Sequence, residues 1–104
     1  MITKRKIVGT WEGTIHLNFF DSTTLIKTVF KDNGYYLTYV GFRGLEFLGE
    51  SEVGKWDYDG KSLNMTDNVG RTTEYKIDFE NDDVMVLTEP IYDVKISCKR
   101  IENE

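Results

Sequence analysis

Residues 45–58 read LEFLGESEVGKWDY, and the number of strands in this stretch decides the fold. Apolar and polar residues alternate near its two ends, at 45–47 and 55–58, and Gly49 and Gly54 lie between these segments. If it formed two strands the chain would have nine. An up-and-down antiparallel barrel needs an even number, because otherwise its first and last strands run parallel where they meet. We therefore predict one long strand, bent or bulged at its glycines.

The rest of the chain shows period-two alternation and not the 3.6-residue apolar repeat of a helix. Turn signals such as Asp59-Gly60 separate the alternating stretches. The predicted strands cover residues 11–20, 25–30, 35–40, 45–58, 62–66, 71–79, 84–88 and 94–100. We expect one all-β domain over residues 1–104: an up-and-down antiparallel β-barrel of about eight strands, with little or no helix. Closure would leave no exposed sheet edge.

The connections between these strands predict two different ends for the barrel. Alternate connections of an up-and-down barrel lie at the same end. One end would receive the tight turns at 32–34, 59–60 and 81–82. The other would receive the longer connections at 21–24, 41–44, 67–70 and 89–93. The pattern therefore predicts a cup with a closed floor and an open mouth.

Composition excludes several classes of function. The net charge of −5 argues against a nucleic-acid partner, and we interpret Lys4, Arg5 and Lys6 as a solvated lead-in or a weak contact for an anionic surface. A single cysteine allows no internal disulfide. No stretch reaches 18 apolar residues and no signal-peptide pattern occurs. We expect a soluble protein without a membrane span, cytoplasmic as written, or periplasmic or secreted if a leader was removed.

Two positions carry a resemblance to a known family. Gly9-Thr10-Trp11 and Arg100 resemble the G-x-W and C-terminal basic residue of lipocalin-like (calycin-type) barrels, and residues 30–36 and 54–63 resemble segments of small bacterial lipocalin-like domains. The resemblance implies that Gly9, Trp11 and Arg100 form the barrel floor, with the basic side chain over the indole. The chain is shorter than full lipocalins and lacks the helix after their eighth strand, which argues against a large ligand cavity.

No catalytic or metal-binding set stands out. The single histidine, His16, falls on the outward face by alternation, and Cys98 falls on the inward face. One histidine and one cysteine cannot supply the nitrogen and sulfur ligands of a zinc or copper site. No nucleophile elbow, phosphate loop or dinucleotide motif occurs. We expect no cofactor and no enzyme activity, although a carboxylate pair acting in the same cup stays open.

The predicted inward faces divide the cup into two halves. The lower half is large and apolar: Trp11, Ile15, Phe30, Tyr36, Trp56, Tyr58, Leu63, Phe79, Ile96 and Cys98. The upper half mixes apolar groups with hydroxyls: Leu17, Phe19, Ile26, Thr28, Thr38, Val40, Met65, Thr73, Tyr75, Leu87 and Val94. Such a mixture is typical of small-molecule pockets, whereas many eight-stranded barrels are simply filled. Both interpretations stay open.

The leading hypothesis is non-enzymatic binding of a small apolar or amphipathic ligand at the open end. The predicted contacts are Leu17, Phe19, Ile26, Val40, Phe42, Met65, Tyr75, Leu87 and Tyr92, with Arg43 or Arg71 for an anionic head group. Glu50 and Glu52 would face inward by strict alternation, so we expect either a bulge between them and Trp56 or an ion pair with a cation such as Arg71.

The alternative hypothesis is a protein-binding barrel of the inhibitor or immunity type. The loops at the mouth would carry an apolar rim of Phe20, Phe42, Leu45, Pro90, Ile91 and Tyr92, with Arg43 among them. Such a rim serves as a ligand portal, a protein-binding patch or an ordinary loop core. An acidic surface would steer the barrel toward a basic partner.

Overall fold

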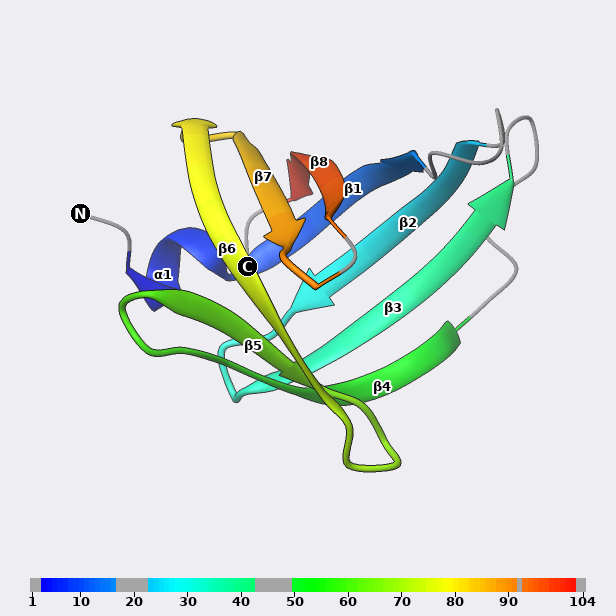
Figure 1. The fold of residues 1–104 in the computed structure, drawn as a ribbon, viewed down its shortest axis with the longest axis vertical. Coiled ribbons are helices and arrows are strands. Elements are labelled where there is room, and N and C mark those ends of the chain that lie inside the picture. The colour runs from blue at the N-terminus through cyan, green and yellow to red at the C-terminus, as the bar shows by residue number, and fades with distance from the viewer. Residues whose placement is uncertain (1–2, 17–22, 43–49, 92, 103–104) are drawn as a thin grey trace.

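The computed structural model describes residues 3–16, 23–42, 50–91 and 93–102, with side chains described over 3–13, 26–39, 53–91 and 93–101. Eight antiparallel strands close into one barrel in sequence order, and β1 pairs with β8 (Figure 1). The predicted all-β up-and-down barrel is therefore confirmed. The strands are β1 (Gly9–His16), β2 (Thr23–Phe30), β3 (Tyr35–Phe42), β4 (Glu50–Tyr58), β5 (Ser62–Thr66), β6 (Thr72–Asn81), β7 (Val84–Glu89) and β8 (Val94–Glu102).

The strand that decided the count contains a bulge, but not where we expected it. From Glu52 to Lys55, β4 pairs with β3 in regular register. The register shifts beyond this point, because Thr38 pairs with Glu52 while Tyr39 pairs with Glu50. The irregularity therefore separates the two glutamates from each other, and the prediction of a bulge between both glutamates and Trp56 is wrong. Residues 45–49 lie outside the described part of the chain.

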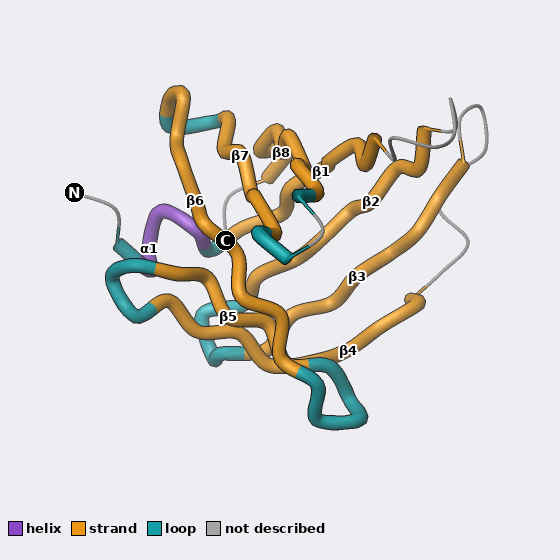
Figure 2. The backbone as a smooth tube through the Cα atoms, in the orientation of Figure 1, coloured by secondary structure: helices purple, strands orange, loops and turns teal. Residues whose placement is uncertain are grey.

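The closed end of the barrel contains one element that the sequence did not reveal. A short helix, α1 (Lys4–Ile7), precedes β1, and Ile7 is fully buried. Lys4 forms an ion pair with Asp57 at the end of β4, and Val8 donates its backbone N–H to Lys4 O at 3.2 Å. Figure 2 shows α1 at the same end as the turn between β4 and β5. Lys4 and Arg5 are exposed, so these basic side chains are solvated as expected, but the segment is a helix that packs over the floor through Ile7 and is not a loose lead-in.

The tight turns have the geometry that their residues favour. Gly60, in the turn between β4 and β5, has φ +93°, which a residue without Cβ adopts at little cost. The Asp59 carboxylate accepts backbone N–H bonds from Ser62 at 2.8 Å and Lys61 at 2.9 Å. These bonds, the one from Ser62 first, lower the pKa of Asp59. The turn is thus specified locally by its Asp and Gly residues.

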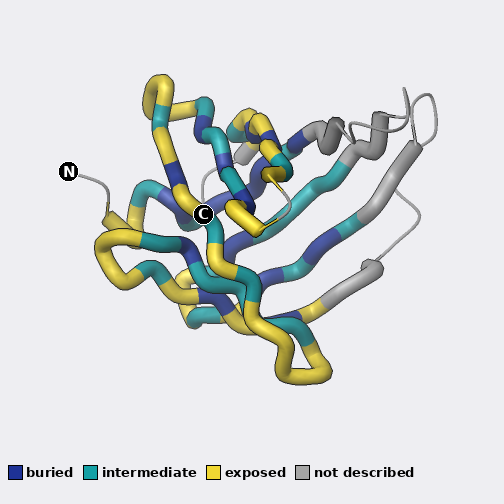
Figure 3. The backbone as a smooth tube through the Cα atoms, viewed as in Figure 1, coloured by how far each residue is buried: buried dark blue, intermediate teal, exposed yellow. Residues whose placement is uncertain are grey.

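Burial alternates along the strands as the period-two pattern predicts, and Figure 3 shows this alternation along β7. The buried apolar core contains Ile7, Trp11, Phe30, Tyr36, Trp56, Leu63, Ile77, Met85, Leu87, Ile96 and Cys98. Ile77 and Met85 follow from the same alternation but were not among the interior residues that we expected. Among the described residues, no helix is long and apolar enough to cross a membrane.

Candidate functional site

The barrel contains an internal cavity of about 150 Å³. Every strand except β4 contributes to its described lining, and the turn between β5 and β6 closes one side. The lining residues are Trp11, Gly13, Ile26, Thr28, Phe30, Tyr36, Thr38, Met65, Asp67, Arg71, Thr73, Tyr75, Leu87, Ile96 and Cys98. The interior is therefore neither an empty cup nor a solid core. Among the described residues, it is filled around Trp11, Phe30 and Trp56 and leaves space beside Gly13 and Thr28.

Trp11 and Arg100 form the floor as the family resemblance implied. They are direct partners across β1 and β8, and the guanidinium carbon lies 4.3 Å from the centre of the indole ring. The indole N–H donates to Ile7 O at 2.8 Å, and Arg100 Nη1 donates to Val8 O at 2.8 Å. Arg100 Nη2 also donates to Lys6 O. The floor therefore joins the two ends of the chain to the first strand.

A second aromatic pair fixes the neighbouring part of the floor. Phe30 and Trp56 meet edge to face, with ring centres 5.3 Å apart. The Trp56 indole N–H donates to Lys31 O at 2.9 Å, so this ring is also tied to the backbone of a turn. Both indole nitrogens thus have backbone partners, as buried tryptophans generally require. Trp56 therefore packs behind Phe30, which lines the cavity.

The hollow begins above this floor on β1, β2, β3 and β8, because the next inward residues of these strands are small. Gly13 pairs with Cys98 on β8 and with Ile26 on β2. Thr28 is the cross-strand partner of both Trp11 and Thr38. Side chains of this size do not reach across a barrel of eight strands, which large interior residues just fill. Residue size along the barrel axis therefore determines where the cavity starts.

The cavity wall combines apolar surface with hydroxyl groups. Thr28, Thr38 and Thr73 contribute hydroxyls, as do Tyr36 and Tyr75. Tyr36, Thr38 and Tyr75 also take part in contacts with the rest of the protein. A hydroxyl both donates and accepts hydrogen bonds, so a group already bonded to the protein keeps capacity for a ligand. No buried side-chain N or O atom of the described residues lacks a hydrogen-bond partner.

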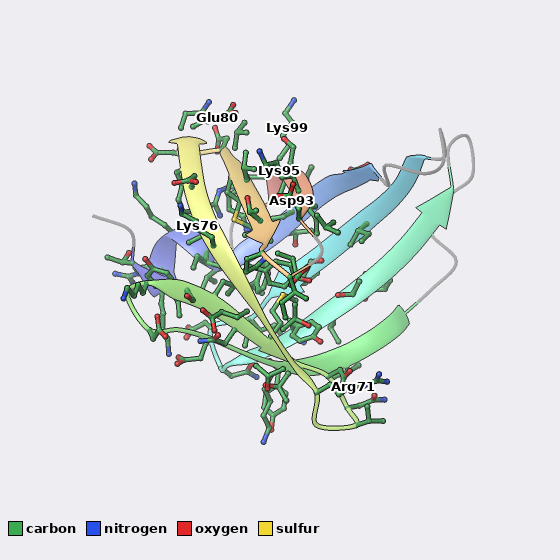
Figure 4. The ribbon with its side chains drawn as sticks, in the orientation of Figure 1. Arg71, Lys76, Glu80, Asp93, Lys95 and Lys99 are labelled. Atoms are coloured by element: carbon green, nitrogen blue, oxygen red, sulfur yellow. The ribbon has the colours of Figure 1, made fainter. Side chains whose placement is uncertain are left out.

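Charge enters the described lining only at the turn between β5 and β6. Asp67 accepts backbone N–H bonds from Arg71 at 2.9 Å and Val69 at 3.0 Å. Its other carboxylate oxygen lies 3.7 Å from Arg71 Nε, and the Arg71 side chain is 84% exposed. Figure 4 shows Arg71 beside this turn and outside the strands. Arg71 therefore belongs to the edge of the cavity, and the expectation of an inward-facing Arg71 is wrong.

Cys98 lines the cavity as a protonated thiol. Desolvation by burial raises its pKa to about 12. The thiol donates a weak hydrogen bond to Ile96 O, with 3.9 Å between the heavy atoms. A thiolate nucleophile requires the opposite shift, so this cysteine does not supply nucleophilic chemistry at neutral pH. The described residues also contain no group of three His, Cys, Asp or Glu side chains placed to bind a metal.

Five of the eleven predicted ligand contacts line the cavity: Ile26, Met65, Arg71, Tyr75 and Leu87. Leu17, Phe19, Arg43 and Tyr92 lie outside the described residues, and Val40 and Phe42 lie on β3 without described side chains. The apolar rim falls on the same undescribed parts, apart from Pro90 and the 81% exposed Ile91. Asp67 was missed, although an Asp that begins a turn is a recognisable signal for a fixed carboxylate.

Comparison with known proteins adds no relative from which a role could be transferred. No protein-family model matches the chain, and no curated protein matches it either. The candidate function therefore has to be argued from the cavity itself.

Proposed function

We propose that this protein is a lipocalin-like carrier or sensor, which binds a small apolar or amphipathic molecule in the barrel cavity and releases it unchanged. The observation that carries the proposal is the lining of the cavity. Apolar side chains such as Ile26, Met65 and Leu87 alternate there with threonine and tyrosine hydroxyls. This is the composition of sites that enclose a ligand and orient it through a few polar contacts.

The chemistry of the lining supports binding over catalysis. Cys98 is held protonated by burial, and the Asp67 carboxylate is occupied by two backbone N–H groups of its own turn. A general base or nucleophile needs an accessible group with a pKa near the working pH. The Trp11–Arg100 floor supports the lipocalin-like part of the proposal, since it closes the barrel opposite the Asp67–Arg71 edge of the cavity.

The test is a titration of the ¹⁵N-labelled protein with phenol, indole, cyclohexanol and palmitate, followed by NMR. The two indole N–H signals provide an internal control, because Trp11 lines the cavity and Trp56 is not among its lining residues. We expect at least one compound to shift Trp11 and Gly13 and to leave Trp56 nearly unchanged. Shifts confined to other residues, or no binding by any compound, would reject the proposal.

A matched pair of variants locates the site. Tyr75 lines the cavity, whereas the neighbouring Lys76 is exposed on the outside of β6. Figure 4 shows Lys76 on β6. We expect Tyr75→Ala to change the affinity of the bound compound and Lys76→Ala to leave it unchanged. Equal effects of the two substitutions would place the ligand outside the barrel.

A further inference from the structure

The size of the cavity restricts the ligand more narrowly than the proposed function does. Pockets for drug-sized ligands occupy about 300–1,000 Å³. An apolar cavity of about 150 Å³ accepts a molecule the size of benzene. The cavity of this barrel has a volume of about 150 Å³. It therefore matches a single ring or a compact fused ring and is too small for a long acyl chain.

The floor prevents the cavity from deepening to accept a longer ligand. Displacing Trp11 would break its bond to Ile7 O and its contact with Arg100. Arg100 is itself held by Val8 O and Lys6 O, and its side chain is only 9% exposed. Because these contacts are mutually dependent, movement of the floor requires several to break together. The lower limit of the cavity is thus a rigid feature.

The wall defines the chemistry of the ring that fits. Tyr75 provides aromatic surface, and Met65 and Cys98 provide polarisable sulfur that packs well against aromatic rings. The threonine and tyrosine hydroxyls of the lining provide hydrogen-bonding partners for one polar substituent. Among the described lining residues, the ionised groups are Asp67 and Arg71, which lie close to each other at the edge. An ionised ligand would lose its hydration on entering the cavity. It would gain no compensating ion pair, because Asp67 and Arg71 already lie beside each other.

We infer that the cavity selects a compact uncharged ring compound with one hydrogen-bonding group, of the phenol or indole class, and excludes long-chain fatty acids. This inference rests on the proposed ligand-binding function and adds a class of ligand to it. It also replaces the anionic head group that we expected from the sequence, because Arg71 is largely exposed and already lies beside the Asp67 carboxylate.

The experiment compares four probes by calorimetry: phenol and indole as neutral rings, benzoate as an ionised ring, and palmitate as a long chain. We expect phenol or indole to bind, and benzoate and palmitate to bind at least about tenfold more weakly, if at all. Tighter binding of benzoate or palmitate would overturn the inference and leave the proposed function standing. Absence of binding by all four probes would contradict the inference. In that case, binding of cyclohexanol in the NMR titration would preserve the proposed function. If cyclohexanol also failed to bind, both the inference and the proposed function would be rejected.

Two adjacent threonines provide the control for the position of the ring. Thr73 lines the cavity, whereas Thr72 is exposed and bonds to Thr66 Oγ1 through its hydroxyl at 2.8 Å. Thr73→Phe should fill the cavity and weaken ring binding by about tenfold or more, while Thr72→Phe should retain it. Should Thr73→Phe fail to fold, Thr28→Leu tests the same expectation from β2. Unchanged binding in a folded cavity-filling variant would overturn the inference.

Discussion

The two halves of the barrel interior are built by the same strands but differ in how they are filled. In the lower half, Trp11 and Phe30 are each 1% exposed and their rings are wedged against other aromatic side chains. In the upper half, Gly13 and Thr28 border open space, as does Cys98, which we had expected in the lower half. The strand pairing continues through both halves without a change of topology. The difference teaches that side-chain size, and not the fold, determines where this barrel holds a cavity.

The halves also differ in how polar groups are used. The Trp11 indole and the Arg100 guanidinium in the floor donate hydrogen bonds to backbone carbonyls of the N-terminal segment. These bonds hold that segment over the closed end of the barrel. In the upper half, the threonines Thr28 and Thr73 line the cavity. The bonded groups of the floor stabilise the closed end, whereas the residues of the upper half leave space for a ligand. Substitutions in the floor should therefore change mainly stability, and substitutions in the upper half should change mainly ligand binding.

The largest effect is expected from Trp11→Ala. It removes the ring that fills the floor, leaves Ile7 O without its donor and leaves Arg100 without the indole face. Truncation of a buried tryptophan costs about 3–5 kcal/mol of unfolding free energy. Urea unfolding at pH 7 measures the loss. A loss below about 1 kcal/mol would show that the floor is not the part that holds the barrel closed.

Glycine substitutions compare the halves more closely. A Cβ at Gly54 would lie 2.3 Å from Thr66 O and 2.5 Å from the Tyr36 ring, whereas one at Gly13 would lie 3.0 Å from Ile96 Cγ2. Overpacking against fixed groups costs about 1–3 kcal/mol, and we expect Gly54→Ala at the upper end and Gly13→Ala at the lower. Side chains beside a cavity have room to yield. Thermal unfolding of both variants tests the order, and a larger loss for Gly13→Ala would reverse the comparison.

Arg100→Lys should cost about 2 kcal/mol, because an ammonium cannot replace the forked guanidinium that bonds to two carbonyls at once. The fork itself bonds to Val8 O and Lys6 O, and Nε bonds to Asp82 O at 3.3 Å, so three carbonyls lose their donor geometry. Lys99→Arg is the control, since Lys99 is exposed on the outside of β8 (Figure 4). Chemical unfolding of both variants measures the difference. Equal stability of the two would mean that charge alone, and not the fork, holds the floor.

The smallest effect at neutral pH concerns Cys98, whose pKa rises from 9.0 to about 12 on burial. Between these values the unfolded thiol releases its proton and the folded thiol keeps it. The unfolded state then binds fewer protons, so the free energy of unfolding falls as pH rises through this window. Cys98→Ala should remove that part of the slope, measured by urea unfolding from pH 8 to 11. An unchanged slope would contradict a buried thiol.

Most of the fold could be predicted because it depends on local patterns. Alternation located all eight strands, and Asp59-Gly60 specified a turn that uses nearby residues alone. The family resemblance placed Trp11 and Arg100 together, and the pairing of β1 with β8 brings them into contact. The bulge in β4 was misplaced because its position depends on pairing with β3, which the alternation of one strand does not report. Helix α1 was missed because four residues show no helical period.

The sequence by itself determined the number of strands, their order and which end of the barrel closes. These follow from period-two alternation and from the parity of antiparallel connections, both of which are properties of the chain read in order. Only the tertiary structure decided that the N-terminal segment covers the floor and that a cavity of about 150 Å³ remains above it. The volume left inside a barrel depends on which side chains meet across it. Closure of the sheet pairs β1 with β8, so that residues far apart in the chain, such as Gly13 and Cys98, line one cavity.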